Sequence, residues 1–587
     1  MAPTPWWKNA SIYQIYPASF QDSNGDGIGD LPGIISRLDY IQSLGVDAIW
    51  VCPMYDSPQY DMGYDISDYE AVYAPYGKVA DVEALIAGCH ARGLRILLDL
   101  VINHTSHEHA WFRASRSSRT DPKRDWYIWR PPRYDPATRQ RQPPNNWRSF
   151  FGGSAWAWDE PTQEYYLHLF APQQPDLNWE NPATRQALYA SAMEFWLQRG
   201  IDGFRVDTVN MYSKPQDFPD APILDPSNPY QPAASLFCNG PRMPEFLTEI
   251  NQVLRKYRPH GDAITVGELP ATPDRSDVLR YVSAAANQLS MVFQFDIVDC
   301  NMGADLRFNT VPHTWTLSDL RARVAATQTL MDGSTDGWST AFLENHDQAR
   351  CVSRWGSPGK HWEKSAKMLA MLVASLSGTL FLYQGQEIGM TNAPNHWDVG
   401  EYKDVDSVNY YRYVQESTDN DPVAIQNAKQ ALDYLARDHA RLPMQWSAAP
   451  QAGFTDAEAK PWMRVHDNFK EVNVKGQTDQ EDSVLGFWKA LLGVRKQFPG
   501  VFAAGVYRDV DPENEEVLVF EKLGRGEKLV VTLNFGTEVR EVQELEGLLK
   551  GKSWRVLVGN YEGDGMEALR PYEGRIYLVD VETATVA

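Results

Sequence analysis

The feature that most restricts the fold of this chain is a regular alternation of short apolar segments with segments of helical periodicity. Residues Ala48–Val51 are apolar without interruption, and Ile96–Val101 is apolar apart from one residue. Between them the apolar residues from Val82 to Cys89 fall at helical spacing, and Gly93 then marks the end of that helix. Strands that are apolar on both faces and alternate with helices are typical of parallel βα units.

This alternation continues far along the chain. The predicted strands are residues 12–16, 48–51, 96–101, 203–206, 264–267, 291–295, 339–343 and 380–383. Eight βα units in a chain of this length predict an α/β fold of the (β/α)8 TIM-barrel type. We assign the barrel to residues 1–104 and 175–505.

Two segments depart from the alternation. Residues 105–174 are rich in Arg, Pro, Trp and Ser, and a structureless loop of that length is unusual in a compact domain. We therefore expect an inserted domain that follows the third strand. Residues 506–587 contain short β-branched segments separated by turn residues, which predicts a C-terminal antiparallel β domain.

Charge and cysteine content restrict the class of function. The net charge of −22 argues against nucleic acid and anionic membranes as partners, because both are bound mainly through Lys and Arg. The five cysteines are widely spaced and odd in number, which favours free thiols in a reducing compartment. No signal-peptide pattern and no apolar run of membrane length occurs, so we expect a cytoplasmic location. The sequence leaves the oligomeric state open.

Acidic residues follow several of the predicted strands. Asp207 follows the fourth strand, Glu268 the fifth and Asp347 the seventh, while His104 follows the third. A single acid in such a place is often a loop cap or half of an ion pair. In a barrel of this type, however, the carboxyl ends of the strands carry the chemistry, so these residues should meet at one mouth.

Two facing carboxyl groups suit cleavage of a glycosidic bond. Arg205 lies two residues before Asp207 on the same strand, so both side chains should point the same way, and the guanidinium should keep Asp207 ionised as a nucleophile requires. Glu268 has apolar neighbours and nearby negative charge, and both should raise its pKa, as a general acid requires.

The motifs at these strand ends resemble those of the α-amylase superfamily, glycoside hydrolase family 13. The resemblance rests on Asn103-His104, Arg205-Val206-Asp207, Gly267-Glu268 and Asn345-His346-Asp347, in that order. The runs at residues 174–179 and 436–446 are similar to the oligo-1,6-glucosidase/maltase branch, and to fungal intracellular α-glucosidases in particular. The resemblance covers essentially the whole chain and implies a barrel with an inserted B domain and a β-sheet C domain.

The resemblance implies roles for individual residues. Asp207 would be the nucleophile, Glu268 the acid/base, and Asp347 a third acid that holds the sugar. Asp61 and Arg437 would close the far end of the site, which makes a pocket and implies release of single glucose units from maltose and short α-glucosides. The expected substrate-binding residues are Asp61, Tyr64, His104, Phe170, Arg205, Thr208, His346 and Arg437. Core packing is nearly as good an explanation for Phe170.

Bond preference depends on the residue after the nucleophile. The resemblance to this branch implies that Val at that position accompanies a preference for α-1,6 bonds. Thr or Ala at the same position accompanies a preference for α-1,4 bonds. Thr208, together with Leu269-Pro270-Ala271 after the acid, predicts α-1,4 preference with possible transglucosylation. The alternatives are an α-1,6-preferring isomaltase or a glucosyltransferase and, more remotely, a non-catalytic relative like a transporter heavy chain.

An acidic loop after the first strand resembles a calcium site. It begins like an EF-hand loop, but Gly33 stands where the bidentate Glu would be, so it is not an EF-hand. A solvated acidic turn is the alternative. The resemblance implies structural Ca²⁺, or Mg²⁺ in its place, and no organic cofactor. The expected ligands are Asp22, Asn24, Asp26, Ile28 and Asp30.

Overall fold

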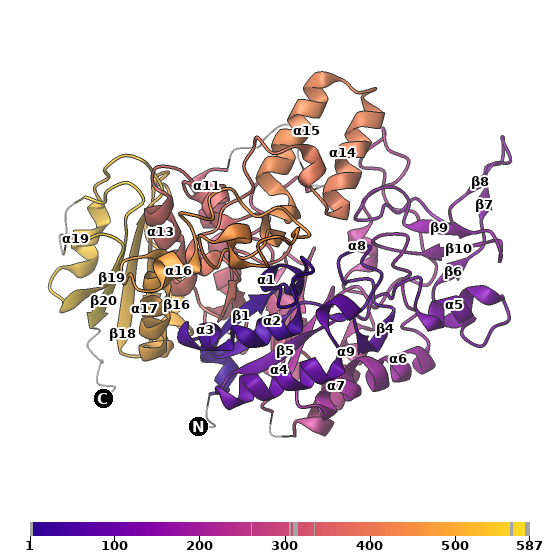
Figure 1. The fold of residues 1–587 in the computed structure, drawn as a ribbon, viewed down its shortest axis with the longest axis horizontal. Helices are drawn as coiled ribbons and strands as arrows, with labels where there is room; N and C mark the ends of the chain where they lie inside the picture. The colour runs from indigo at the N-terminus through magenta and orange to yellow at the C-terminus, as the bar shows by residue number, and fades with distance from the viewer. Residues whose placement is uncertain are drawn as a thin grey trace.

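The protein has three parts in the computed structural model, which describes residues 4–580 except 260, 304–306, 309–314, 334 and 564–567. A central barrel carries an inserted β-rich lobe on one side and a C-terminal sheet on the other (Figure 1). Residues 581–587 of the expected C-terminal domain lie outside the described residues.

Eight parallel strands form the barrel. Their order is β13-β12-β11-β5-β2-β1-β15-β14, and a parallel bridge between Val292 and Ser339 joins the two ends of that order. The predicted TIM-barrel fold is therefore confirmed. The strands are β1 (Ser11–Ile15), β2 (Ala48–Val51), β5 (Arg95–Leu100), β11 (Gly203–Val206), β12 (Ile264–Glu268), β13 (Met291–Phe293), β14 (Thr340–Ala341) and β15 (Thr379–Tyr383).

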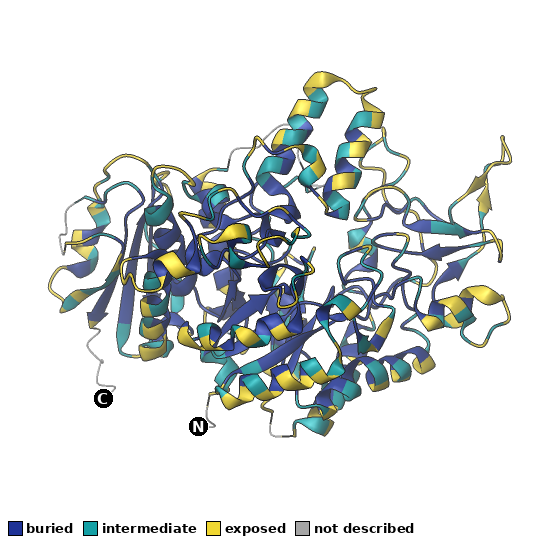
Figure 2. Cartoon of the chain, in the orientation of Figure 1, coloured by how far each residue is buried: buried dark blue, intermediate teal, exposed yellow. Residues whose placement is uncertain are grey.

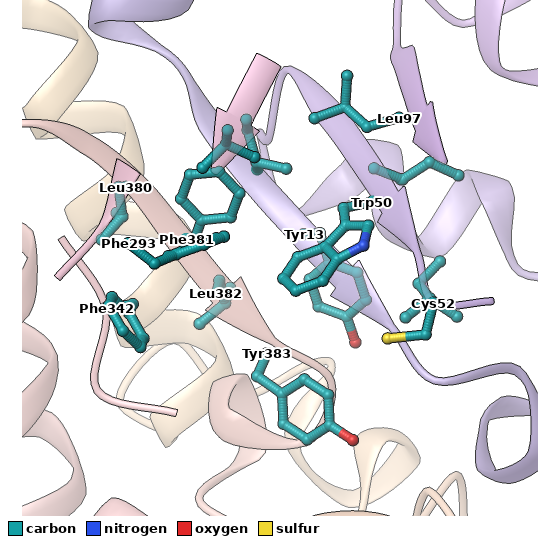
Figure 3. Packing of buried hydrophobic residues seen from close by; sticks show 14 of the residues in the cluster. Tyr13, Trp50, Cys52, Leu97, Phe293, Phe342, Leu380, Phe381, Leu382 and Tyr383 are labelled. Carbon is teal, nitrogen blue, oxygen red and sulfur yellow. The ribbon is translucent and has the colours of Figure 1, made fainter. Parts of the chain in front are cut away.

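Large side chains fill the barrel interior. The ring centroid of Phe293 lies 4.7 Å from that of Phe381 and 5.5 Å from that of Trp50 (Figure 3). Strands buried on both faces need apolar side chains throughout, which explains their uninterrupted apolar sequences. Because the interior is packed, a ligand can reach the barrel only at the ends of its strands.

Helices surround the barrel with their buried faces inward and their exposed faces outward (Figure 2). The helical spacing of apolar residues from Ile34 to Leu44 predicts one helix, but two short helices form here, because Arg37 leaves helical dihedrals at φ −107° and ψ 6°. The main helices are α2 (Leu31–Ser36), α3 (Leu38–Ser43), α4 (Val79–Ala91), α6 (Pro182–Leu188), α7 (Phe195–Gln198), α9 (Met243–Tyr257), α10 (Arg275–Val282), α11 (Leu317–Gln328), α13 (Trp362–Ser375) and α17 (Val484–Gln497).

The inserted lobe contains a three-stranded antiparallel sheet of β6 (Trp129–Arg130), β10 (Glu164–Leu167) and β9 (Trp156–Asp159). Its hydrophobic core is shared with the loop that follows β11. Trp147 lies 5.6 Å from both Phe218 and Phe237, and its Nε1 donates to the carbonyl oxygen of Pro219 at 2.8 Å. Residues 211–238 therefore complete the core of the inserted lobe. The remaining elements are α5 (Ala110–Ser117) and the hairpin of β7 (Arg133–Tyr134) and β8 (Arg141–Gln142).

Two expectations about irregular structure were wrong. The sequence predicts a loop-rich segment from Thr391 to Trp446, but this segment contains a helical hairpin of α14 (Val405–Ser417) and α15 (Pro422–Leu435). The C-terminal sheet, in the order β16-β17-β18-β20-β19, is joined by a helix, α19 (Gln543–Leu549), where none was expected. Its strands are β16 (Val506–Asp509), β17 (Val517–Leu523), β18 (Glu527–Asn534), β19 (Trp554–Gly559) and β20 (Gly574–Asp580). No helix in the described part of the chain is both long and apolar enough to cross a membrane.

Candidate active site

The close approach of β11 to β12 places Asp207 beside Glu268. Gly203 starts β11 at φ 156°, and a Cβ atom there would lie 2.0 Å from the carbonyl oxygen of Ile264, so glycine is required for this pairing. The register pairs Val206 with Gly267. The next residues on the two strands, Asp207 and Glu268, therefore meet at the same level of the barrel mouth.

One guanidinium group links the carboxylates at this mouth. Arg205 Nη1 lies 2.6 Å from Asp207 Oδ1 and 2.7 Å from Asp99 Oδ1, and its Nη2 lies 2.8 Å from Glu268 Oε2. Arg205 is itself buried. A buried charge needs a partner, and here one cation is shared by three acids, so the cluster carries an excess of potential negative charge.

Burial, together with this excess of carboxyl groups, raises the pKa of Glu268 and of Asp207. Burial, with help from Asp207 and Asp347, raises the pKa of Glu268 to about 7, although Arg205 opposes it. The pKa of Glu268 is therefore raised, as the sequence predicts. Burial and the neighbouring Asp99 also raise the pKa of Asp207, to about 6, against the opposing effect of Arg205. Arg205 thus favours the ionised form of Asp207, but burial outweighs this effect and keeps the pKa of Asp207 above its ordinary value.

A second cluster, the arginine fork, closes the far end of the site. Arg437 donates from Nη1 to Asp347 at 3.0 Å and from Nη2 to Asp61 at 3.1 Å. It also donates to both carboxylate oxygens of Asp404, from Nη2 at 2.8 Å and from Nε at 2.9 Å. Arg441 Nη2 lies 2.9 Å from the same Asp347 oxygen. The predicted pairing of Asp61 with Arg437 is therefore present, and Asp347 joins it.

The electrostatics of Asp347 differ from those of the first cluster. Burial alone would raise the pKa of Asp347, but His346, Arg437 and Arg441 outweigh it and hold this pKa well below its ordinary range. These neighbours therefore strongly favour the ionised form of Asp347. The three predicted acids thus fall into two classes, two with raised pKa values and one with a depressed value.

Two stacked rings connect the clusters. Tyr64 and His346 are nearly parallel, with ring centroids 5.1 Å apart, and the Tyr64 hydroxyl donates to Asp99 at 3.2 Å. Gln14 donates its amide N–H to His346 Nδ1 at 2.9 Å, which leaves Nε2 facing Asp347 Oδ2 at 3.1 Å. The ring of His346 is therefore fixed between the cluster around Arg205 and the arginine fork.

His104 and Phe170 form the wall toward the inserted lobe. The His104 ring lies 5.1 Å from Phe170, and its Nε2 lies 3.0 Å from the carbonyl oxygen of Tyr64. Burial lowers the pKa of His104, which favours the neutral form of its ring. Phe170 is half-buried and also stacks on Phe150 at 5.1 Å, so it serves as both a wall of the site and part of the lobe's core.

Behind His104 lies a buried polar trio. Lys214 Nζ lies 2.9 Å from Asp176 Oδ2 and 3.0 Å from Asn103 Oδ1. The Asn103 amide donates to Asp176 at 3.1 Å, and its nitrogen lies 3.2 Å from His104 Nδ1. An Nδ1 that accepts this bond places the His104 proton on Nε2. Asn103 lies in the loop after β5 and Lys214 in the loop after β11, so both loops help to hold the ring of His104 in place.

Thr208 occupies an unusual backbone conformation. Its φ of 38° lies in the left-handed region, which is costly for a β-branched residue. In this conformation its backbone N–H donates to Glu268 Oε2 at 3.1 Å, while its hydroxyl donates to Asp207 Oδ2 at 3.3 Å. Thr208 therefore contacts both carboxyl groups of the first cluster.

Several residues of the site were not predicted. Asp99 is fully buried and also accepts from Trp50 Nε1 at 3.0 Å; its signal was an acid within an apolar strand. Arg441 lies within a run that was compared with the family but was not singled out. Asp404 has no local signal, because its partners lie more than thirty residues later. Gln174, which donates to Asp61 at 3.0 Å, lies like Arg441 within a run that resembles the family, but its role was not predicted.

The predicted metal loop lies apart from these clusters. Its donors are all oxygen atoms, as Ca²⁺ prefers, but several already accept protein hydrogen bonds. Asp22 accepts from the backbone of Asn24 and Gly27, and Asp30 accepts from Ser23 and Gly33. Among the described residues, no three His, Cys, Asp or Glu side chains are grouped to hold a metal ion. The Ca²⁺ site therefore stays a prediction that rests on the resemblance.

Comparison with known proteins finds relatives that are similar along nearly the whole chain. An α-glucosidase of Candida albicans is 49% identical over 99% of this chain and all of its own length. An oligo-1,6-glucosidase of Saccharomyces cerevisiae is 44% identical over 98% of both chains. The crystal structure of Bacillus licheniformis trehalose-6-phosphate hydrolase superimposes with a TM-score of 0.87 at 39% identity, covering 98% of this chain and 100% of that chain.

The family model described as the α-amylase catalytic domain matches residues 14–504, which include every acid of the two clusters. This match covers most of the chain. The sequence relatives are similar along nearly its whole length, so the match is not confined to the barrel. The chain belongs to the α-amylase family, glycoside hydrolase family 13, and is a glycoside hydrolase.

Proposed function

We propose that this enzyme is a retaining, exo-acting α-glucosidase that releases glucose from maltose and short α-glucosides. The observation that carries the proposal is the position of Asp207 and Glu268, both within 2.8 Å of one guanidinium, that of Arg205. Two carboxyl groups held this near to each other favour the close pair of a retaining enzyme rather than the wider pair of an inverting one. The α-glucosidase relatives support the choice of substrate.

In the first step the Asp207 carboxylate attacks the anomeric carbon of the terminal glucose. The glycosidic C–O bond breaks, and Glu268 gives its proton to the departing oxygen. A raised pKa for Glu268 supports this assignment, because the acid must hold a proton near neutral pH. The products are a glucosyl ester of Asp207 and the shortened sugar.

In the second step Glu268, now ionised, removes a proton from a water molecule. The oxygen of that water attacks the anomeric carbon, and the ester bond to Asp207 breaks with release of glucose. A hydroxyl group of another sugar can take the place of water, which gives transglucosylation. The neutral state of Glu268 is restored at the end of the cycle.

The arginine fork supports the choice of exo action. Arg437 ties Asp347 to Asp61 by direct hydrogen bonds, and this link supports a site that is closed at one end rather than an open groove. Ionised Asp347 offers acceptors for two sugar hydroxyls and stabilises positive charge that develops at the anomeric carbon. A chain end fits such a pocket, whereas the middle of a polysaccharide does not.

The proposed α-1,4 preference is tested by comparing kcat/KM for maltose and isomaltose. We expect the wild-type enzyme to prefer maltose and Thr208→Val to shift the ratio toward isomaltose by roughly tenfold. Valine keeps the shape of threonine but removes the hydroxyl that reaches Asp207. Thr208→Ser, which keeps this hydroxyl, should retain the maltose preference. A wild-type enzyme that prefers isomaltose would overturn the proposed linkage.

The pH dependence of kcat/KM is expected to be bell-shaped, with a maximum between about pH 6 and 7. Asp207 must be ionised, so activity should fall as the pH drops below its pKa of about 6. Glu268 must be protonated, so activity should fall as the pH rises above about 7. The two limbs belong to the interacting pair rather than to either residue alone. A profile with only one limb would contradict this assignment of roles.

We also propose that the loop from Asp22 to Asp30 binds Ca²⁺ in a structural role. Removing Ca²⁺ with a chelator should then lower the melting temperature by roughly 2 °C or more, since a ligand in excess stabilises the state that binds it. Asp26 is exposed, so Asp26→Asn should fold normally but lose the response to Ca²⁺. Equal melting temperatures with chelator and with excess Ca²⁺ would remove this site.

A cytoplasmic location remains part of the proposal. All five cysteines are buried free thiols, which supports a reducing compartment.

A further inference from the structure

A cavity lies at the end of the barrel opposite to the acidic clusters. Its volume is about 270 Å³, and Ala263, Ser290 and Trp338, which precede β12, β13 and β14, line it. Glu268 stands at the other end of β12, and a strand of five residues spans roughly 15 Å. A ligand in this cavity would therefore not meet a substrate bound at Asp207.

Three cationic side chains line this cavity: Lys8, Arg255 and Arg258. In the part of the chain that the structure describes, none of them forms a direct ion pair with a carboxylate. Asp336 is the one acid among the described lining residues, and its carboxylate accepts from Ser283. In a protein with a net charge of −22, a cavity with this excess of positive charge is exceptional.

Each cation is held by neutral groups that leave donors free. Lys8 Nζ lies 4.5 Å from the ring centroid of Trp338 and 5.6 Å from that of Trp7. Arg255 uses Nη2 on Asn287 Oδ1 at 2.7 Å, and Arg258 uses Nη2 on the carbonyl oxygen of Ile201 at 2.8 Å. A guanidinium has five N–H donors, so both arginines can still bind an anion through two parallel hydrogen bonds.

We propose that this cavity, which we call the basal cavity, binds a compact phosphate dianion, either free or as the ester of a small sugar. Phosphate matches the paired donors of arginine and the point charge of lysine. The volume lies near the lower limit for small-molecule sites, so a monosaccharide phosphate fits it better than a nucleotide. Trp7 and Asn251 also line the cavity, so an apolar ring and a polar side chain are both available to a small sugar.

The state of Lys8 agrees with this geometry. Burial lowers the pKa of Lys8, against an opposing effect of Asp336, so its charged form is poorly compensated in the protein alone. A bound dianion would supply the missing charge. The proposal does not depend on the glycosidase mechanism, because none of these residues belongs to the acidic clusters.

The test is isothermal titration of the full-length protein, at low ionic strength, with inorganic phosphate and separately with glucose 6-phosphate. We expect saturable binding of one equivalent, which weakens as salt is added. The double variant Arg255→Gln/Arg258→Gln should bind at least tenfold more weakly. Arg139→Gln, an exposed change in the β7–β8 hairpin, should bind like the wild type. Tighter binding of the ester would identify a sugar phosphate, and equal binding would identify free phosphate.

Two controls keep the proposal open to refutation. If the double variant does not fold, Lys8→Gln replaces it, with the same expected weakening. Maltose hydrolysis should show no competitive inhibition by either probe. Absence of saturable binding, wild-type affinity in the folded variants, or competition with maltose would each overturn the proposal.

Discussion

Replacing Asp207 with asparagine is expected to lower kcat for maltose hydrolysis by roughly 10⁴-fold or more, since the covalent step loses its nucleophile. Asparagine has the same shape and can still accept a hydrogen bond from Arg205 Nη1, which lies 2.6 Å from the wild-type oxygen. The fold and the binding of sugar should therefore persist. The measurement is the initial rate of glucose release, together with the melting temperature of each variant.

The matched control for this change is Asp217→Asn, which alters an exposed acid in the loop after the same strand. Its activity should equal that of the wild type. A slowly hydrolysed fluorinated glucoside should also leave one glucosyl unit on the peptide that contains Asp207, as detected by mass spectrometry. Substantial maltose hydrolysis by folded Asp207→Asn would show that another residue attacks the sugar.

Glu268→Gln should have the next largest effect, and its size should depend on the leaving group. With maltose, we expect kcat to fall by about 10²–10⁴-fold, the usual contribution of general acid catalysis. With an activated aryl α-glucoside the leaving group needs no proton, so the glucosyl ester of Asp207 should form rapidly and accumulate. A burst of released phenol, followed by slow turnover, would report this difference.

Azide provides the decisive control for Glu268→Gln, because it attacks the glucosyl ester without base catalysis. Added azide should restore turnover of the aryl glucoside and give glucosyl azide, whereas the wild-type rate should hardly change. The exposed change Glu546→Gln, on α19, should behave like the wild type. Equal losses on maltose and on the aryl glucoside, without azide rescue, would exclude Glu268 as the acid/base.

The barrel was predictable because its strands are buried on both faces, and such strands are apolar throughout. The hairpin of α14 and α15 was not, because it buries only a narrow stripe of residues such as Tyr410, Val414 and Leu432. Tyr413 and Val423 are apolar yet exposed on the same helices, which obscures the helical period. Periodicity thus reports burial, and it fails where a helix is buried on only a small part of its surface.

The residues of the site also differ in how far the sequence predicts them. Asp207, Glu268 and Asp347 were found because each follows an apolar strand, which is a local signal. The grip of Asp404 on Arg437 joins two segments that no local pattern relates, and only the fold brings them together. The raised pKa of Asp207 could not be foreseen either, since it depends on how deeply the fold buries this carboxyl group and on its distance from Asp99.

The shared core of the inserted lobe has a consequence for recombination between relatives. A chimera that takes residues 105–174 from another enzyme, but keeps residues 211–238 of this one, would place a foreign partner against Phe218 and Phe237. The mismatch would be transmitted to Asp207, because the same loop starts directly after the nucleophile. Residues 105–174 and residues 211–238 should therefore be exchanged together in any chimera.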